Sequence, residues 1–147
     1  MAYSINDLKN TNREKLGNSV DITVFRLVRF MDLERYLGNG ANAVIYAAGK
    51  KLGKELSPKT VEEVAKFCED LKIGYVEIVG ENPLTIRVRE CITCSGLKET
   101  GKQLCYFEGG FIAGCIESVF NKKVNVKETH CAGLGDDFCQ FRVEFVE

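Results

Sequence analysis

The sequence of 147 residues contains no tryptophan, two prolines, two methionines and a single histidine. His130 has no serine or cysteine obviously paired with it, so a hydrolytic triad has no support. The formal net charge is -1, which leaves no electrostatic footprint for binding nucleic acid. No apolar run approaches the roughly 20 residues of a membrane-spanning helix. Residues 1–15 are too polar for a signal peptide, so we expect a cytoplasmic protein without membrane insertion.

The sequence also lacks repeats, linkers and low-complexity segments. Hydrophobic residues make up 45% and charged residues 28% of the chain, which is typical of a globular protein rather than a disordered one. We therefore expect one domain that spans residues 1–147.

The first half of the chain reads as helical. Residues 21–37 have an ambiguous pattern, for which we favour a helix that ends at Gly38. Apolar residues at spacings of three and four predict a second helix over 41–56. Gly49 and Gly53 lie four residues apart on it, which would let another backbone come close. A third helix follows, with a capping box at its start.

The second half changes to a period of two. Strands are predicted at 75–79, 84–89, 124–128 and 138–146. Between the two strand pairs, Thr100 and Gln103 are spaced as a capping box for a helix that runs to about Asn121. The predicted fold class is α+β, with N-terminal helices packed on an antiparallel sheet made of two hairpins, and a helix inserted between the hairpins.

Seven cysteines are a high count, and without a secretion signal a disulfide framework is a poor explanation for them. The strand alternation points both Cys139 and Glu128 inward, where an ionised carboxylate needs a partner. Cys131 follows three residues after Glu128. A zinc ion would satisfy all three side chains, because zinc accepts thiolate and carboxylate ligands. Alternatively, the thiols are only buried and Glu128 turns out to solvent.

The fourth ligand of such a site stays open on spacing alone. Cys105 lies near the predicted start of a helix, where the helix dipole favours a thiolate. Cys91 and Cys94 form a Cys-x-x-Cys pair in a loop, which suits either metal binding or dithiol chemistry. His130 is a further candidate ligand.

Two other cysteines, Cys68 and Cys115, lie on apolar helical stripes and are interpreted as packing residues. Residues 38–43 match the dinucleotide-binding fingerprint in letters, but a charged stretch precedes them where a buried strand is required. Gly110 and Gly114 lie within the inserted helix, which glycine weakens. Close packing of another helix is the preferred explanation for them, and a dimer interface is the alternative.

Taken together, one set of residues resembles a known family, the 4-vinyl reductase domain. The matching residues are Glu90-Cys91, Gly96-Leu97, Cys105, Gly109-Gly110-Phe111, Gly114, Glu128, Cys131, Gly135-Asp136 and Cys139-Gln140-Phe141. The match covers roughly residues 84–145, and it is specific as a combination although no single piece would suffice. The resemblance implies an α+β fold shared with subunits of the TRAPP vesicle-tethering complex, often as a homodimer. It also implies a role in binding small hydrophobic molecules.

The resemblance further implies a ligand set. In the related sensor domains of aromatic-responsive regulators, zinc is held by a cysteine, a glutamate and two further cysteines. That pattern falls on Cys105, Glu128, Cys131 and Cys139, and so favours Cys105 over the Cys-x-x-Cys pair. The family name mentions a reductase, but it does not transfer as an activity, because the chain has no recognisable catalytic acid–base pair.

We therefore expect a non-catalytic, zinc-stabilised domain that binds a small hydrophobic or aromatic molecule as a sensor or carrier. Candidate residues to line an apolar pocket are Ile45, Leu52, Phe107 and Phe111. One alternative is a thiol- or cofactor-dependent reductase that uses Cys91 and Cys94. The other is a dimeric assembly subunit joined through the face of Gly110 and Gly114.

Overall fold

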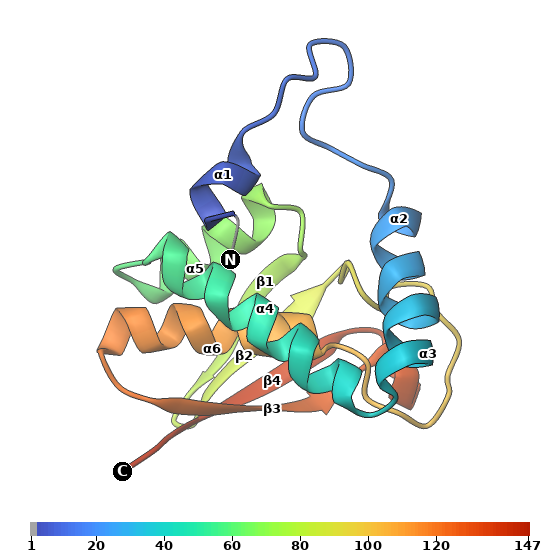
Figure 1. The fold of residues 1–147 in the computed structure, drawn as a ribbon. Coiled ribbons are helices and arrows are strands. Elements are labelled where there is room, and N and C mark those ends of the chain that lie inside the picture. Colours follow the sequence, from blue (N-terminus) through green and yellow to red (C-terminus); the bar gives the residue numbers. More distant parts are fainter. Residues whose placement is uncertain (1–2) are drawn as a thin grey trace.

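The computed structural model describes residues 3–147. The helical first half contains α1 (Ile5–Lys9), α2 (Ile22–Leu27), the π-helix η1 (Val28–Leu33), α3 (Glu34–Leu37), α4 (Gly40–Leu56) and α5 (Val61–Asp70). The second half contains β1 (Tyr75–Glu81), β2 (Leu84–Arg89), α6 (Tyr106–Phe120), β3 (Val124–His130), the 3₁₀ turn η2 (Ala132–Leu134) and β4 (Cys139–Phe145). Figure 1 shows α4 and α6 lying across one face of the sheet.

All neighbouring strands are antiparallel, in the order β1-β2-β4-β3. The two hairpins therefore join through β2 and β4, and the inserted α6 connects them. This arrangement of helices on a four-stranded antiparallel sheet confirms the predicted α+β class.

Alternation within the central strands fills the core as the sequence predicts. Leu84, Ile86 and Val88 of β2 are at most 8% exposed, and they share their face of the sheet with Phe141 and Val143 of β4. The helix α6 covers this face with an almost wholly buried surface. Burial of this apolar area supplies the main favourable free energy of the fold.

Helices α4 and α6 touch backbone to backbone through glycines. A Cβ atom added at Gly110 would collide with the carbonyl oxygen of Tyr46, and one at Gly114 with that of Lys50. Gly49 and Gly53 on α4 meet the α6 backbone in the same way. The prediction of close helix packing is therefore confirmed. The alternative of a dimer interface at Gly110 and Gly114 is wrong, because α4 of the same chain occupies that face.

The predicted capping box at Thr100 and Gln103 is also wrong, since α6 begins at Tyr106. The backbone N–H groups of Thr100 and Gly101 donate instead to the carbonyl oxygen of Gly133, at 3.0 and 2.8 Å. The side chain of Gln103 donates to the carbonyl oxygen of Glu128 at 2.7 Å. Tertiary bonds to the β3–β4 connection thus hold this segment extended, which delays the start of the helix.

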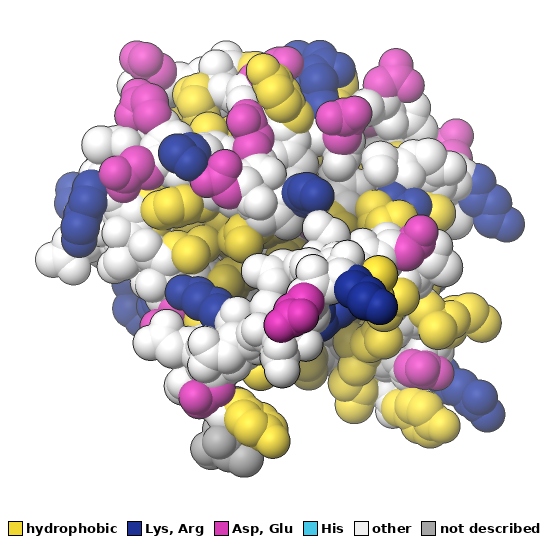
Figure 2. All heavy atoms as spheres, turned by 90° about the horizontal axis from the view of Figure 1, so that it is seen from above, with side chains coloured by type: hydrophobic (Ala, Val, Ile, Leu, Met, Phe, Trp, Pro, Cys, Tyr) yellow, Lys and Arg dark blue, Asp and Glu magenta, His cyan; other side chains and the backbone are white. Residues whose placement is uncertain are grey.

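The segment from α2 to α3 is helical, as predicted, and ends at Gly38 with φ 55°. A helix rather than a buried strand precedes residues 38–43, so the match to the dinucleotide fingerprint has no structural support. This segment exposes several apolar side chains: Val24, Leu27, Val28, Met31, Tyr36 and Leu37. Figure 2 shows hydrophobic side chains gathered on the side of the molecule where α2 and α3 lie in Figure 1.

Among residues 3–147, no helix combines the length and apolar character that crossing a membrane requires.

Candidate metal centre

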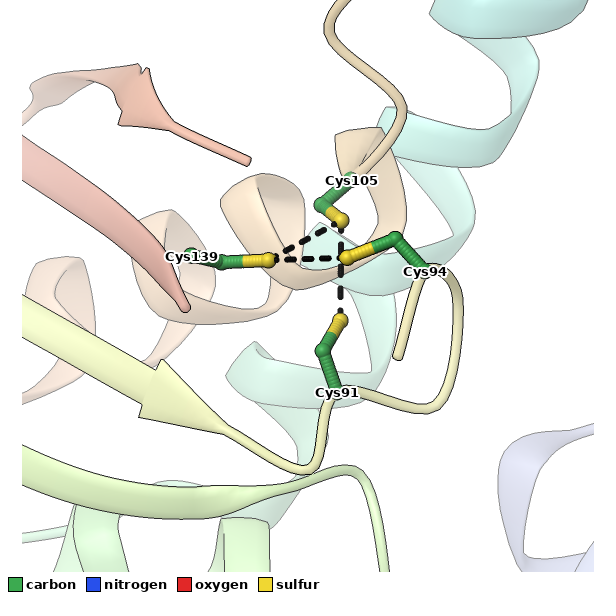
Figure 3. A group of neighbouring side chains, drawn as sticks. All are labelled: Cys91, Cys94, Cys105 and Cys139. Carbon is green, nitrogen blue, oxygen red and sulfur yellow. Dashed lines mark hydrogen bonds between the residues drawn. The ribbon is translucent and has the colours of Figure 1, made fainter. Parts of the chain in front are cut away.

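Five cysteines from four separate parts of the chain meet at one end of the sheet. Cys91 and Cys94 lie in the loop after β2, Cys105 immediately precedes α6, Cys131 follows β3 and Cys139 begins β4. Each is at most 2% exposed. Figure 3 shows the side chains of four of them converging on a common point.

The predicted ligand set is brought together. One ligand atom from each of Cys105, Glu128, Cys131 and Cys139 lies within 4.8 Å of all the others. The Sγ atom of Cys105 is 3.3 Å from that of Cys139 and 3.8 Å from that of Cys131. Four ligands around a tetrahedral zinc ion with Zn–S bonds of about 2.3 Å lie about 3.8 Å apart. The donor positions therefore fit one tetrahedral ion.

Glu128 provides a second indication of a cation site. Its Oε2 accepts a hydrogen bond from the backbone N–H of Cys105 at 3.3 Å, whereas its buried Oε1 has no hydrogen-bond partner among the described residues. Burial, followed by the nearby Cys131, raises the pKa of Glu128 to about 9. A buried carboxylate in this state is costly unless a cation compensates it. The donor set of three sulfurs and one oxygen is one that zinc accepts.

The thiols themselves are electrostatically frustrated. Hydrogen bonds from neighbouring thiols, Cys105 first, lower the pKa of Cys94 to about 4 and that of Cys131 to about 6. The same contacts, with Cys131 first, raise the pKa of Cys105. Like charges at this separation cannot all form at once, and the protons are shared across the cluster. A divalent ion removes the conflict, because it favours every thiolate that it binds.

Cys91 and Cys94 enter a second set of donors. Their sulfurs lie with those of Cys105 and Cys139 within 4.8 Å of one another. Cys91 is 3.5 Å from Cys105, and Cys94 is 3.1 Å from Cys139. The two alternatives that the sequence left open for the fourth ligand are therefore neighbours in space, sharing Cys105 and Cys139.

A buried polar pair supports the Cys-x-x-Cys loop. The hydroxyl of Thr93 donates to Oε1 of Glu108 at 2.5 Å, and both residues are at most 1% exposed. Burial raises the pKa of Glu108 to about 7 despite this bond. Arg26 on α2 donates to the carbonyl oxygens of Ile92 and Ser95 at 2.9 and 2.8 Å. These contacts were missed from the sequence, where a glutamate in an otherwise apolar helix was the only available signal.

The remaining candidates lie outside both donor sets. A register shift in β3 between Glu128 and His130 pairs His130 with Gln140 and ends the inward alternation. The His130 ring packs against Phe138 at 5.3 Å instead. Cys68 and Cys115 are buried in the core, as predicted, and burial raises the pKa of Cys115 to about 12.

The residues proposed for an apolar pocket are mostly engaged in packing. Phe111 is fully buried in the core, and the ring of Phe107 packs edge-on against Phe25 at 5.7 Å. Leu52 packs against the core from α4, and Ile45 is 5% exposed. Their role in ligand binding stays a prediction.

Two clefts adjoin the cysteine cluster. One, of about 330 Å³, is lined by Tyr46, Gln103, Cys105, Tyr106, Gly109, Val126, Lys127, Glu128 and Phe141. The other, of about 580 Å³, lies beside the Cys-x-x-Cys loop and includes several acidic side chains, among them Glu90, Asp136 and Asp137. The smaller cleft therefore has the more aromatic wall, and two of its residues belong to the predicted metal ligands.

Comparison with known proteins identifies the family. The family model of the 4-vinyl reductase domain matches residues 84–145. The uncharacterized protein MJ1642 of Methanocaldococcus jannaschii is 50% identical over 134 residues, which cover 91% of this chain and 83% of MJ1642. The chain belongs to the 4-vinyl reductase domain family. The resemblance read from the sequence is thereby confirmed.

Solved structures extend the comparison of this 4-vinyl reductase domain protein. A vinyl-4-reductase family protein from Methanocaldococcus jannaschii is 26% identical, with a TM-score of 0.71 and coverage of 90% of this chain and 86% of that one. The phenol-responsive sensory domain of the transcription activator PoxR, solved with phenol, has a TM-score of 0.67 at 12% identity and covers 84% and 74%. Subunit 3 of a trafficking protein particle complex from Naegleria fowleri, covalently bound to palmitic acid, has a TM-score of 0.57 at 19% identity and covers 86% and 89%. The last two share the fold with this chain.

Proposed function

We propose that this 4-vinyl reductase domain protein binds a small hydrophobic or aromatic molecule, as a sensor or carrier, in a fold held together by zinc. The ion would be bound by Cys105, Glu128, Cys131 and Cys139. The observation that carries the proposal is the convergence of these four donors from three elements, with the buried Oε1 of Glu128 left without a partner among the described residues. Bound there, zinc would hold the start of α6 to β3 and β4.

The cleft of about 330 Å³ is the proposed site for the small molecule. Its volume lies at the lower end of the range for ligand pockets. Tyr46, Tyr106 and Phe141 offer aromatic surface, while Glu128 and Cys105 in its wall are also proposed metal ligands. A molecule in this cleft would therefore contact residues whose positions depend on the metal.

The structural neighbours support this class of function. The PoxR domain is phenol-responsive and was solved with phenol, and the trafficking-complex subunit is covalently bound to palmitic acid. One fold thus accommodates both an aromatic and an aliphatic molecule. Because fold does not determine function, the proposal for this chain depends on its own cleft and donors.

The burial of Cys91 and Cys94 argues for metal holding over the alternative of dithiol chemistry. Each is 2% exposed, whereas a redox-active thiol needs access to its substrate. Both sulfurs also contact sulfurs of the proposed zinc ligands.

We also propose a homodimer formed through the exposed apolar residues from α2 to α3. Val24, Leu27 and Met31 are each more than half exposed, and a contiguous apolar patch of this kind marks an interaction surface.

The ligand proposal is tested with phenol and palmitate as probes. Binding to the zinc-loaded protein is measured by isothermal titration calorimetry, for the wild type and for Tyr106→Ala. We expect at least one probe to bind and Tyr106→Ala to weaken it about tenfold, because truncation removes aromatic surface from the cleft. Tyr36→Ala is the matched control, since Tyr36 is 76% exposed on α3. Equal affinities in both variants would place the ligand elsewhere.

A further inference from the structure

Two sets of four donors overlap in this molecule, and the overlap has a specific form. One set contains Cys91 and Cys94, the other contains Glu128 and Cys131, and both contain Cys105 and Cys139. We propose that the six side chains hold two divalent metal ions, with the thiolates of Cys105 and Cys139 bridging between them.

The donor count matches such a centre. Each ion would have four ligands, which is the coordination number of zinc in structural sites. Two of the four would be terminal and two shared, so six side chains complete both tetrahedra. Cys91 and Cys94 would be terminal on one ion, and Glu128 and Cys131 on the other.

The distances support shared thiolates. The two sulfurs in both sets, those of Cys105 and Cys139, lie 3.3 Å apart. The contacts from Cys91 to Cys105 and from Cys94 to Cys139 measure 3.5 and 3.1 Å. All are close to the edge of about 3.8 Å expected between donors on one tetrahedral zinc ion. Figure 3 shows that Cys91 and Cys94 approach the bridging pair from their own loop.

Charge also favours a second ion over a single one. One divalent ion with three thiolates and a carboxylate carries two net negative charges, and it leaves Cys91 and Cys94 as buried thiols beside it. Two divalent ions with all six anionic donors carry the same two net negative charges. The second ion thus recruits both remaining thiolates without adding charge to a buried site, where uncompensated charge is costly.

The second position is structurally supported on its own side. Arg26 binds the carbonyl oxygens of Ile92 and Ser95, and Thr93 within the Cys-x-x-Cys sequence is bonded to the buried Glu108. These contacts hold both ends and the centre of the loop. The two thiols are therefore held in place as metal ligands should be.

This inference does not depend on the small-molecule ligand, but it rests on the proposed first metal position through the shared thiolates. The test is native mass spectrometry of protein loaded with zinc and then separated from free metal. We expect two zinc ions per chain in the wild type and one in a Cys91→Ser, Cys94→Ser double variant. A Cys68→Ser, Cys115→Ser double variant is the matched control and should keep two. A wild type with one ion, which the double variant at 91 and 94 also keeps, would overturn the two-metal centre and leave the first site intact. A wild type with none would overturn both.

A measurement on the wild type alone covers the case in which the variants fail to fold. Cadmium-113 nuclear magnetic resonance of the cadmium-loaded protein should give two resonances split by mutual coupling through the bridging sulfurs. Two uncoupled resonances, or a single one, would contradict the shared thiolates.

Discussion

Thr93 illustrates how single residues outside the donor set shape the site. Its hydroxyl is the one hydrogen-bond donor found for the carboxyl group of Glu108 among the described side chains, and Oε2 of that carboxyl has no partner there. The pair connects the Cys-x-x-Cys loop to the first turn of α6. Loss of the hydroxyl should therefore be felt both in stability and in the geometry of the loop.

We expect Thr93→Val to lower the free energy of unfolding by about 1–3 kcal/mol, because a buried carboxyl loses its partner. Urea unfolding of the zinc-loaded protein measures the change. Thr85→Val is the control, since the Thr85 hydroxyl bonds to the carbonyl oxygen of Pro83 at an exposed position. Similar losses in both variants would mean that the Thr93 hydroxyl has no special role.

Glu117 supplies a pH-dependent test at the same scale. Burial would raise its pKa, but hydrogen bonds from Lys54 and Lys50 and from the backbone N–H of Val124 outweigh burial and lower it. The two ammonium groups lie 2.9 and 3.0 Å from the carboxylate oxygens. Since the folded-state pKa is depressed, the stabilisation is present in full above the ordinary pKa and is lost as the pH falls through the lowered value.

We therefore expect Glu117→Gln to lower the free energy of unfolding at pH 7 by about 1–3 kcal/mol, a modest value because solvent screens the partly exposed lysines. The difference from the wild type should shrink below about pH 4. Denaturant unfolding at several pH values measures it. Glu144→Gln, which removes exposed pairs with Lys127 and Arg142, should have little effect. A difference at position 117 that is constant down to pH 3 would contradict the assignment.

At the scale of elements, the contact between α4 and α6 explains the glycines of α6. We expect Gly110→Ala to destabilise the protein by about 1–3 kcal/mol, because the new methyl group meets the backbone of Tyr46 and overpacking has costs of this size. Thermal unfolding measures the effect.

The adjacent Gly109 is the control for that substitution. A Cβ atom at Gly109 would lie 3.6 Å from the nearest atom of Phe141, an ordinary contact. Gly109→Ala should therefore leave stability unchanged or raise it by up to about 1 kcal/mol through helix propensity. If Gly110→Ala were as well tolerated as Gly109→Ala, the close helix contact would be disproved.

The elements also show which features the sequence could predict. Strand alternation correctly turned Glu128 and Cys139 toward the core, because a period of two leaves each side chain one face. It misplaced His130, since the register shift before it has no clear signature in the sequence. The start of α6 was misplaced because the backbone bond from Thr100 to Gly133 depends on a partner far along the chain. The nearness of Cys91 to Cys105 was invisible for the same reason, as loop paths follow from tertiary contacts.

At the scale of the whole molecule, the apolar surface from α2 to α3 predicts self-association. Sedimentation equilibrium should give twice the mass of a single chain for the wild type. Met31→Glu should shift the equilibrium to monomer, because it places a charge within the patch, where Met31 is 63% exposed. Leu16→Glu is the control, since Leu16 is 72% exposed outside this patch and its substitution should leave the mass unchanged. A wild type that stays monomeric at high concentration would contradict the proposed dimer.

Metal also acts at this scale, because the proposed ligands join the start of α6 to both strands of the second hairpin. A zinc ion there would make the stability of the fold depend on metal. A strong chelator should therefore lower the midpoint of thermal unfolding by at least about 10 °C, as the loss of several kcal/mol would in a domain of this size. Adding zinc back should restore it.

The most direct test is a crystal of the protein measured on both sides of the zinc absorption edge. The account predicts an anomalous peak bounded by the sulfurs of Cys105, Cys131 and Cys139 and by the carboxylate of Glu128, with Zn–S distances of about 2.3 Å. Density without an anomalous peak between these four side chains, in protein prepared with zinc, would contradict it.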